Sequence, residues 1–131
     1  MVERLDEKAV QKVSGPTWES LREDFFKISR KLLSVCPVTA SQLTTIYVKF
    51  CTTTAMNEVY AVVWIKTSKQ IVVGMSLPDD VEDARLGPAP KGHPYTGLTQ
   101  FVTVTHDDPI PDGLLRWAKL AYETASGTAG R

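Results

Sequence analysis

Hydrophobic residues recur at helical spacing near the start of the chain. Large apolar side chains stand three or four positions apart at Trp18, Leu21, Phe25, Ile28 and Leu32. This spacing predicts an amphipathic helix with charged residues on its other face. We expect the helix to begin after Thr17, a good N-cap, and to end before Pro37, because proline keeps the preceding residue out of helical conformation.

From Leu43 the apolar period changes to two, which is typical of β-strands. The pattern predicts strands over 46–51, 57–66 and 69–77, and the last two form a hairpin with a short link. A fourth strand is predicted over 98–106. A helix start is then indicated by Asp108, Pro109, Pro111 and Asp112, and this closing helix carries apolar residues from Leu114 to Ala125.

The predicted order of elements is α-β-β-β-loop-β-α. It indicates a two-layer α+β domain with a single antiparallel sheet of about four strands, an N-terminal helix and a C-terminal helix. We place the domain at 16–125, between a flexible lead-in over 1–15 and a flexible tail over 126–131. Residues 78–97 contain four of the eight prolines and three of the eight glycines, which predicts a long surface loop.

The stretch V-Y-A-V-V-W-I at 59–65 has no polar position on either face of the predicted strand. Even-numbered residues from Tyr60 to Trp64 are expected on one face and odd-numbered residues from Ala61 to Ile65 on the other. The helices cover one face only. The other face, which carries either Trp64 or Ile65 and is expected to include Tyr47 and Val72, needs a second cover, because exposed large apolar side chains are unfavourable. That cover is the 78–97 loop, a second copy of the chain, or a ligand.

Charge and composition narrow the classes of function. Fifteen basic and fifteen acidic residues are mixed along 131 residues, and the absence of a basic stripe argues against nucleic-acid binding. Cys36 and Cys51 are too few for a disulfide scaffold and are expected to be reduced. The longest apolar run, 59–65, is far shorter than the roughly 20 residues that span a bilayer. We therefore expect a cytoplasmic protein without membrane association.

The segments I-Y-V-K-F (46–50), V-Y-A-V-V-W-I (59–65), I-V-V-G-M-S-L-P (71–78) and A-Y (121–122) give the chain a family resemblance. From about residue 18 to 125 it resembles a prokaryotic family catalogued as domain of unknown function 5655. Some members are labelled predicted transport proteins, and similar domains occur beside endonuclease-like domains. The stretch R-L-G-P-A-P-K-G-H-P-Y-T-G (85–97) is richer in glycine and proline than in many members.

Chemical motifs are sparse. The acidic run Asp79, Asp80, Glu82 and Asp83 lacks the spacing of a calcium loop and indicates a solvated turn. His106-Asp107-Asp108 lies between the fourth predicted strand and the closing helix, a position that favours helix capping over acid–base chemistry. His93 and His106 have no ligand spacing, and no nucleophile elbow or phosphate loop is present. We therefore predict no catalytic residue, no metal site and no cofactor.

Two classes of function remain. The first is a non-enzymatic interaction or accessory module that self-associates or binds a protein partner through a sheet face and the 78–97 loop. The second is a small enzyme or a binding protein for a small acidic ligand, with a pocket between that loop and the sheet. The sequence favours the first, so an enzyme is not expected. The candidate binding residues are Tyr47, Lys49, Trp64, Arg85, Lys91 and His93.

Overall fold

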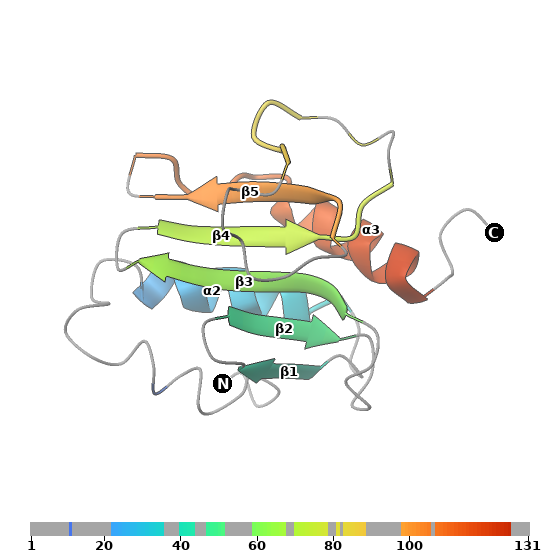
Figure 1. Ribbon diagram of the computed structural model, residues 1–131, viewed down its shortest axis with the longest axis horizontal. Coiled ribbons are helices and arrows are strands. Elements are labelled where there is room, and N and C mark those ends of the chain that lie inside the picture. Colours follow the sequence, from blue (N-terminus) through green and yellow to red (C-terminus); the bar gives the residue numbers. More distant parts are fainter. Residues whose placement is uncertain are drawn as a thin grey trace.

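One antiparallel sheet with helices on one side forms the molecule (Figure 1). The computed structural model describes residues 11, 22–35, 40–43, 47–51, 59–67, 70–78, 81, 83–88, 98–105 and 107–126. Within them the elements are α2 (Arg22–Leu33), β1 (Ala40–Leu43), β2 (Tyr47–Cys51), β3 (Val59–Thr67), β4 (Gln70–Met75), β5 (Gln100–Val104) and α3 (Leu114–Ser126). The strands lie in the sheet in chain order, from β1 to β5.

The predicted α+β class and the single antiparallel sheet are confirmed. The four predicted strands correspond to β2, β3, β4 and β5, and β1 adds a fifth at one end. Its four residues, Ala-Ser-Gln-Leu, are too short to show a period of two, so the sequence pattern did not reveal it. The predicted lead-in over 1–15, apart from residue 11, and the tail beyond residue 126 lie outside the described residues.

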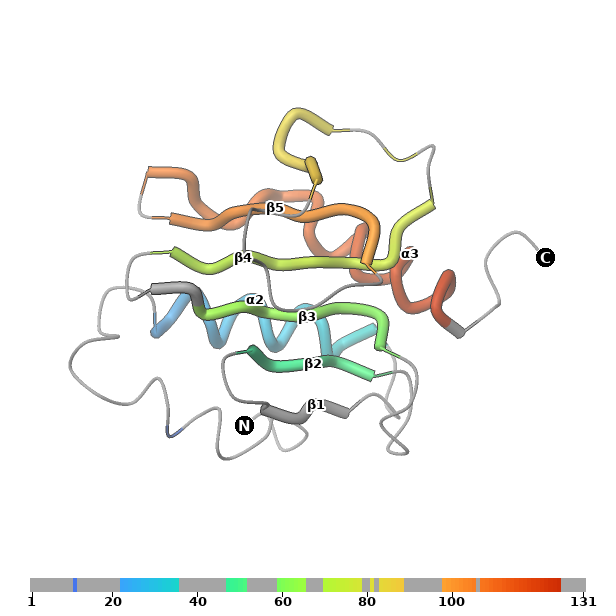
Figure 2. The backbone as a smooth tube through the Cα atoms, in the orientation of Figure 1, coloured from blue at the N-terminus to red at the C-terminus, as the bar shows by residue number. Residues whose placement is uncertain are grey.

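Helices α2 and α3 lie on the same side of the sheet (Figure 2). The apolar stripe predicted for the first helix is buried where the structure describes it, at Phe25, Ile28 and Leu32. Leu114 and Trp117 of α3 are buried in the same core. The α3 helix begins just after Pro111, whose carbonyl accepts a hydrogen bond from the Leu114 N–H at 3.1 Å. This start agrees with the one predicted from the prolines and Asp112.

A β-bulge in β3 changes which way Tyr60 points. Phe50 pairs with Ala61 and Cys51 pairs with Val59, so Tyr60 is an extra residue in the ladder. Tyr60 therefore lies in the core under the helices, where its hydroxyl donates a hydrogen bond of 2.6 Å to the Leu32 carbonyl. The prediction that Tyr60 shares a face with Trp64 is wrong, because strict alternation fails at a bulge.

Gly74 allows an aromatic ring to lie close against the other face of the sheet. It pairs with Phe101 across β4 and β5. A Cβ atom at Gly74 would lie 2.5 Å from Phe101 Cε2 and 2.8 Å from Leu98 Cδ1, far closer than ordinary contact. Only a residue without a side chain therefore leaves room for this arrangement, which explains a glycine in the middle of a buried strand.

We predict that Gly74→Ala lowers the free energy of unfolding by about 1–3 kcal/mol, because the added methyl group must displace Phe101 and Leu98. Gly87→Ala is the matched control, since a Cβ at Gly87 has nothing within 4 Å. Its effect should stay within about 0.5 kcal/mol. Urea denaturation of the two variants measures the difference. Equal stability of both variants would contradict the close packing at Gly74.

Candidate functional site

The sheet face opposite the helices carries a small apolar cluster of its own. We call it the second-face cluster, and its members are Tyr47, Trp64, Val72, Leu98 and Phe101. Trp64 is 8% exposed and Phe101 is 5% exposed, while Tyr47 and Leu98 are half-buried at its margin. Because these values hold for the single chain, neither a second copy nor a ligand is required to keep water from Trp64.

The sequence predicted that the second face would be covered, and it is buried. The 78–97 loop as the cover stays a prediction, because residues 89–97 lie outside the described residues. The close approach of Phe101 at Gly74 and the contact of Leu98 with this face were missed. A signal for Gly74 was available, since a glycine inside an apolar strand often marks a close approach. Leu98 has no such signal, because its neighbour on this face, Gly74, is distant in the sequence.

Three of the predicted binding residues lie together on β2 and β3. Tyr47 is directly paired with Trp64, and Lys49 is paired with Val62, on the same face of the sheet. Tyr47 and Lys49 are half-buried. Among the strand side chains that the structure describes, Lys49 is the one that carries a charge. The structure thus places an aromatic pair and a single ammonium group at neighbouring positions of β2 and β3.

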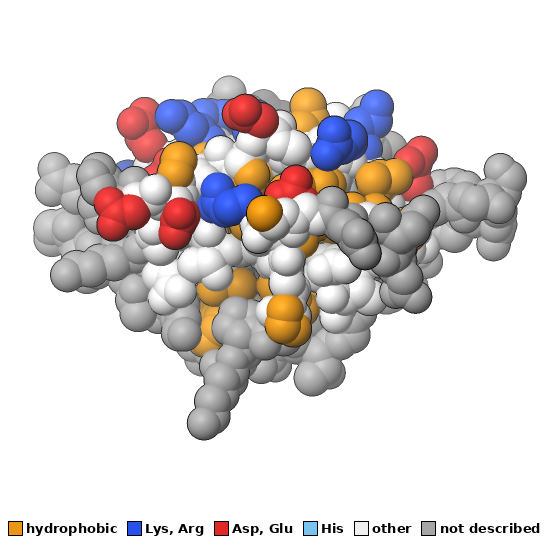
Figure 3. Space-filling view, turned by 90° about the horizontal axis from the view of Figure 1, so that it is seen from above, with side chains coloured by type: hydrophobic (Ala, Val, Ile, Leu, Met, Phe, Trp, Pro, Cys, Tyr) orange, Lys and Arg blue, Asp and Glu red, His pale blue; other side chains and the backbone are white. Residues whose placement is uncertain are grey.

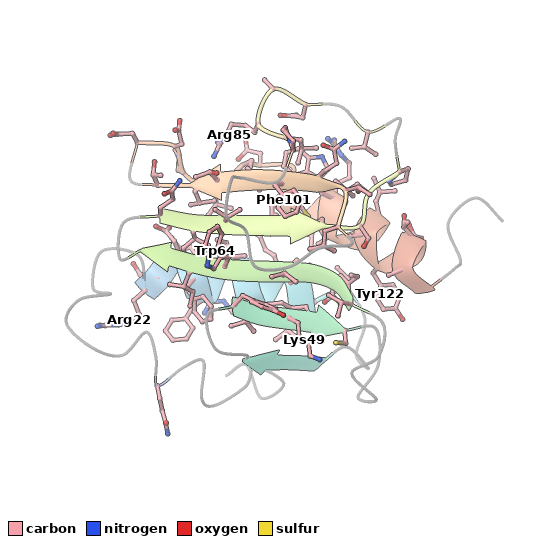
Figure 4. The ribbon with its side chains drawn as sticks, in the orientation of Figure 1. Arg22, Lys49, Trp64, Arg85, Phe101 and Tyr122 are labelled. Carbon is pink, nitrogen blue, oxygen red and sulfur yellow. The ribbon has the colours of Figure 1, made fainter. Side chains whose placement is uncertain are left out.

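Arg85 lies at the opposite end of the sheet, beyond β5 (Figure 4). Its guanidinium group donates hydrogen bonds to the main-chain carbonyls of Thr103, at 3.0 Å, and Asp108, at 3.2 Å. Strands are about 4.8 Å apart, so β2 and β5 are separated by about 14 Å. The structure therefore does not bring Arg85 together with Tyr47, Lys49 and Trp64. The other two candidates, Lys91 and His93, lie outside the described residues.

The segment 83–88, which we call the edge strap, closes the outer side of β5. Gly87 and Phe101 exchange two main-chain hydrogen bonds, of 2.9 and 2.8 Å. The Asp83 carboxylate accepts a hydrogen bond of 2.9 Å from the Arg85 N–H and so folds the strap into a local turn. Together with the Arg85 guanidinium, these bonds occupy main-chain groups that an edge strand would otherwise expose.

Charged side chains are unevenly distributed over the surface. Seen from the β5 end, the described Lys, Arg, Asp and Glu side chains gather in one half of the view, and the other half shows hydrophobic and uncharged groups (Figure 3). Most of the charged residues belong to α2, α3 and the segments before α3. The sheet face with the second-face cluster is therefore nearly uncharged in the described part of the chain.

An open groove of about 320 Å³ lies between α2 and the segment before α3. Its charged lining residues are Asp24, Lys27, Lys31 and Asp112. Two carboxylates and two ammonium groups give this groove no net charge with which to select an ion. It also lies away from the sheet face, so it is not the pocket that the sequence predicted between the 78–97 loop and the sheet.

Groups with catalytic or metal-binding chemistry do not converge within the described residues. No set of three or more His, Cys, Asp and Glu side chains there could hold a metal ion. Of the predicted acidic turn, Asp83 is described, and its carboxylate is bound to the strap. His106 lies outside the described residues, while Asp108 closes a turn with Thr105 through main-chain and hydroxyl hydrogen bonds of 2.9 and 3.0 Å.

Comparison with known proteins adds no relationship. No protein family, no curated protein and no solved structure matches the chain. The resemblance to domain of unknown function 5655 therefore stays a prediction. Within the described part of the chain, neither the length nor the apolar character of any helix is sufficient to cross a membrane.

Trp64 anchors the second-face cluster, and its removal tests whether that cluster stabilises the fold. We predict that Trp64→Ala lowers the free energy of unfolding by about 3–5 kcal/mol, because it leaves a large cavity beside Val72 and Phe101. Chemical denaturation followed by circular dichroism measures the loss. Trp64→Phe keeps most of the contact and should retain most of the stability. A change near zero for Trp64→Ala would mean that the side chain is in water.

Cys51 gives the fold a pH dependence. Burial raises the pKa of its thiol above the ordinary value of 9.0, and the nearby charge of Lys49 lowers it by less. The folded chain therefore holds this proton more tightly than the unfolded chain. The resulting stability is complete below pH 9.0 and is lost as the pH rises through the raised pKa.

We predict that the wild-type protein loses more stability than Cys51→Ala between about pH 8 and pH 11. Denaturation curves of both proteins across this range give the comparison. The difference between the two sets of curves reports the contribution of the Cys51 thiol. A stability difference between the two that does not change with pH would contradict the buried, protonated thiol.

Proposed function

We propose that this chain is a non-enzymatic interaction or accessory module, and that its contact surface is the β1–β2 end of the sheet. The observation that carries the proposal is the pairing of Tyr47 with Trp64 beside Lys49, on a sheet face that has no other charge among the described strand side chains. Tyrosine contributes strongly to protein interfaces, since it buries a large area at a small entropic cost. Tyr47 is half-buried and can bury more area on binding, while Trp64, which is 8% exposed, packs beside it.

The position of the other described candidate supports the same proposal. Arg85 was expected to attract an acidic ligand, but its guanidinium group holds the main chain at Thr103 and Asp108. An arginine used in this way stabilises the fold at the end of the sheet away from Tyr47. The small-molecule alternative, with a pocket formed by the 78–97 loop, therefore has no described residue arrangement in its favour.

Light scattering combined with a thermal-shift screen separates the two functions. An interaction module that self-associates should show a mass above 14.5 kDa at high concentration. Its melting temperature should not change with phosphate, citrate or divalent cations. A monomer at every concentration, whose melting temperature rises with one of these ions, would instead support the ligand-binding alternative, because a ligand stabilises the folded state that binds it.

A further inference from the structure

The two edges of the described sheet differ in whether the outward-pointing main-chain groups of the edge strand are hydrogen-bonded. At β5, the edge strap bonds Phe101 through Gly87 and bonds the Thr103 carbonyl through Arg85. At the other end, β1 pairs with β2 and is the last strand of the sheet. No described residue outside β2 pairs with β1. The described part of the sheet can therefore be extended by another strand at β1 but not at β5.

The alternation of main-chain groups shows which residues of β1 face outward. Phe101 bonds the edge strap, so its N–H and C=O point away from β4, and successive residues of a strand point these groups to opposite sides. In the observed register, the same alternation gives four pairs whose main-chain groups point toward each other: Val73–Val102, Val62–Gly74, Val48–Val63 and Gln42–Lys49. The main-chain N–H and C=O groups of Ala40 and Gln42 therefore point toward β2, and those of Ser41 and Leu43 point away from the sheet.

We infer that β1 pairs antiparallel with β1 of a second copy of this chain. The inference rests on the proposed function and names its partner. The strand sequence Ala-Ser-Gln-Leu has no charge, proline or glycine, and so it lacks the residues that usually prevent pairing at an exposed edge. The whole chain has no net charge, which removes a general repulsion between two copies.

Symmetry and hydrogen bonding select the register of the pair. A two-fold axis between two antiparallel copies of β1 places one residue opposite its own copy. Registers in which a residue lies opposite its neighbour are excluded, because they would set an outward-facing residue opposite an inward-facing one, and only outward-facing residues can exchange hydrogen bonds. An axis at Gln42 sets Ser41 opposite Leu43 of the second copy, and Leu43 opposite its Ser41. Both of these pairs are hydrogen-bonded pairs within β1. An axis at Ser41 leaves one such pair inside the strand, so the register centred on Gln42 is favoured.

The same axis fixes the shape of the dimer. It stands perpendicular to the sheet, so the helices of both copies lie on one side and the two second faces form one surface. The Lys49 residues of the two copies are then separated by three strand spacings, about 14 Å, beyond the roughly 8–10 Å over which charges act in physiological salt. Tyr47 and Lys49 on each β2 thus flank the junction, with Trp64 one strand further out on each β3, and the two lysines do not repel each other.

Sedimentation velocity over about a hundredfold range of concentration tests the inference. The wild-type chain should pass from monomer to dimer. Ser41→Pro removes an outward N–H and leaves the bonds of Ala40 and Gln42 to β2, so its dimer dissociation constant should rise at least about tenfold. Ser41→Thr is the matched control, because it keeps the N–H and should dimerise like the wild type.

Amide hydrogen exchange of the wild-type protein provides a second measurement that needs no variant. Protection of the Ser41 and Leu43 amides should increase with protein concentration, while the Phe101 amide, bonded to Gly87, should not change. A dimer that persists in Ser41→Pro, without concentration-dependent protection at Ser41, would overturn pairing through β1 but leave the interaction module intact. A wild-type monomer at every concentration would overturn the self-pairing itself and leave an extended segment of another protein as the partner of the edge.

Discussion

The burial of β3 and β4 on both faces is the constraint on which the rest of the molecule depends. Val63 and Val73 face the helices, while Trp64 and Val72 face the other way, and all four are buried. A sheet of this kind needs material on each side, because leaving two large apolar side chains in water is unfavourable by roughly 1.5–3 kcal/mol each. The helices fill one side, and the second-face cluster shows that the other is also dry.

The two faces are organised by different means. On the helix side, long apolar residues from both helices and the sheet pack into one large core, which includes Tyr60 through its bulge. On the other side, the cluster is small and depends on a flat arrangement, with the Phe101 ring against the main chain at Gly74. The first face supplies most of the core, and the second adds a smaller cluster that depends on the absence of a side chain at Gly74.

The two ends of the described part of the sheet are also unequal. The edge strap uses Arg85 and Gly87 to occupy the outer groups of β5. Tyr47 and Lys49 lie on β2, next to β1, and Trp64 lies on β3, the middle strand. The described sheet thus has one edge whose outer main-chain groups are bonded by the strap and one edge strand, β1, whose sequence carries no charge.

Sequence periodicity by itself determined the class of fold, the element order and the apolar faces of both helices, because the alternation of side chains along a helix or strand is a local property. It also identified Tyr47, Lys49 and Trp64, which the observed register does bring together. Only the tertiary structure decided the inward turn of Tyr60, the existence of β1 and the engagement of Arg85 with Thr103. The contacts of Tyr60 with Leu32 and of Arg85 with Thr103 join residues that are distant in the chain and meet only after folding, while β1 is too short for its pattern to show a period.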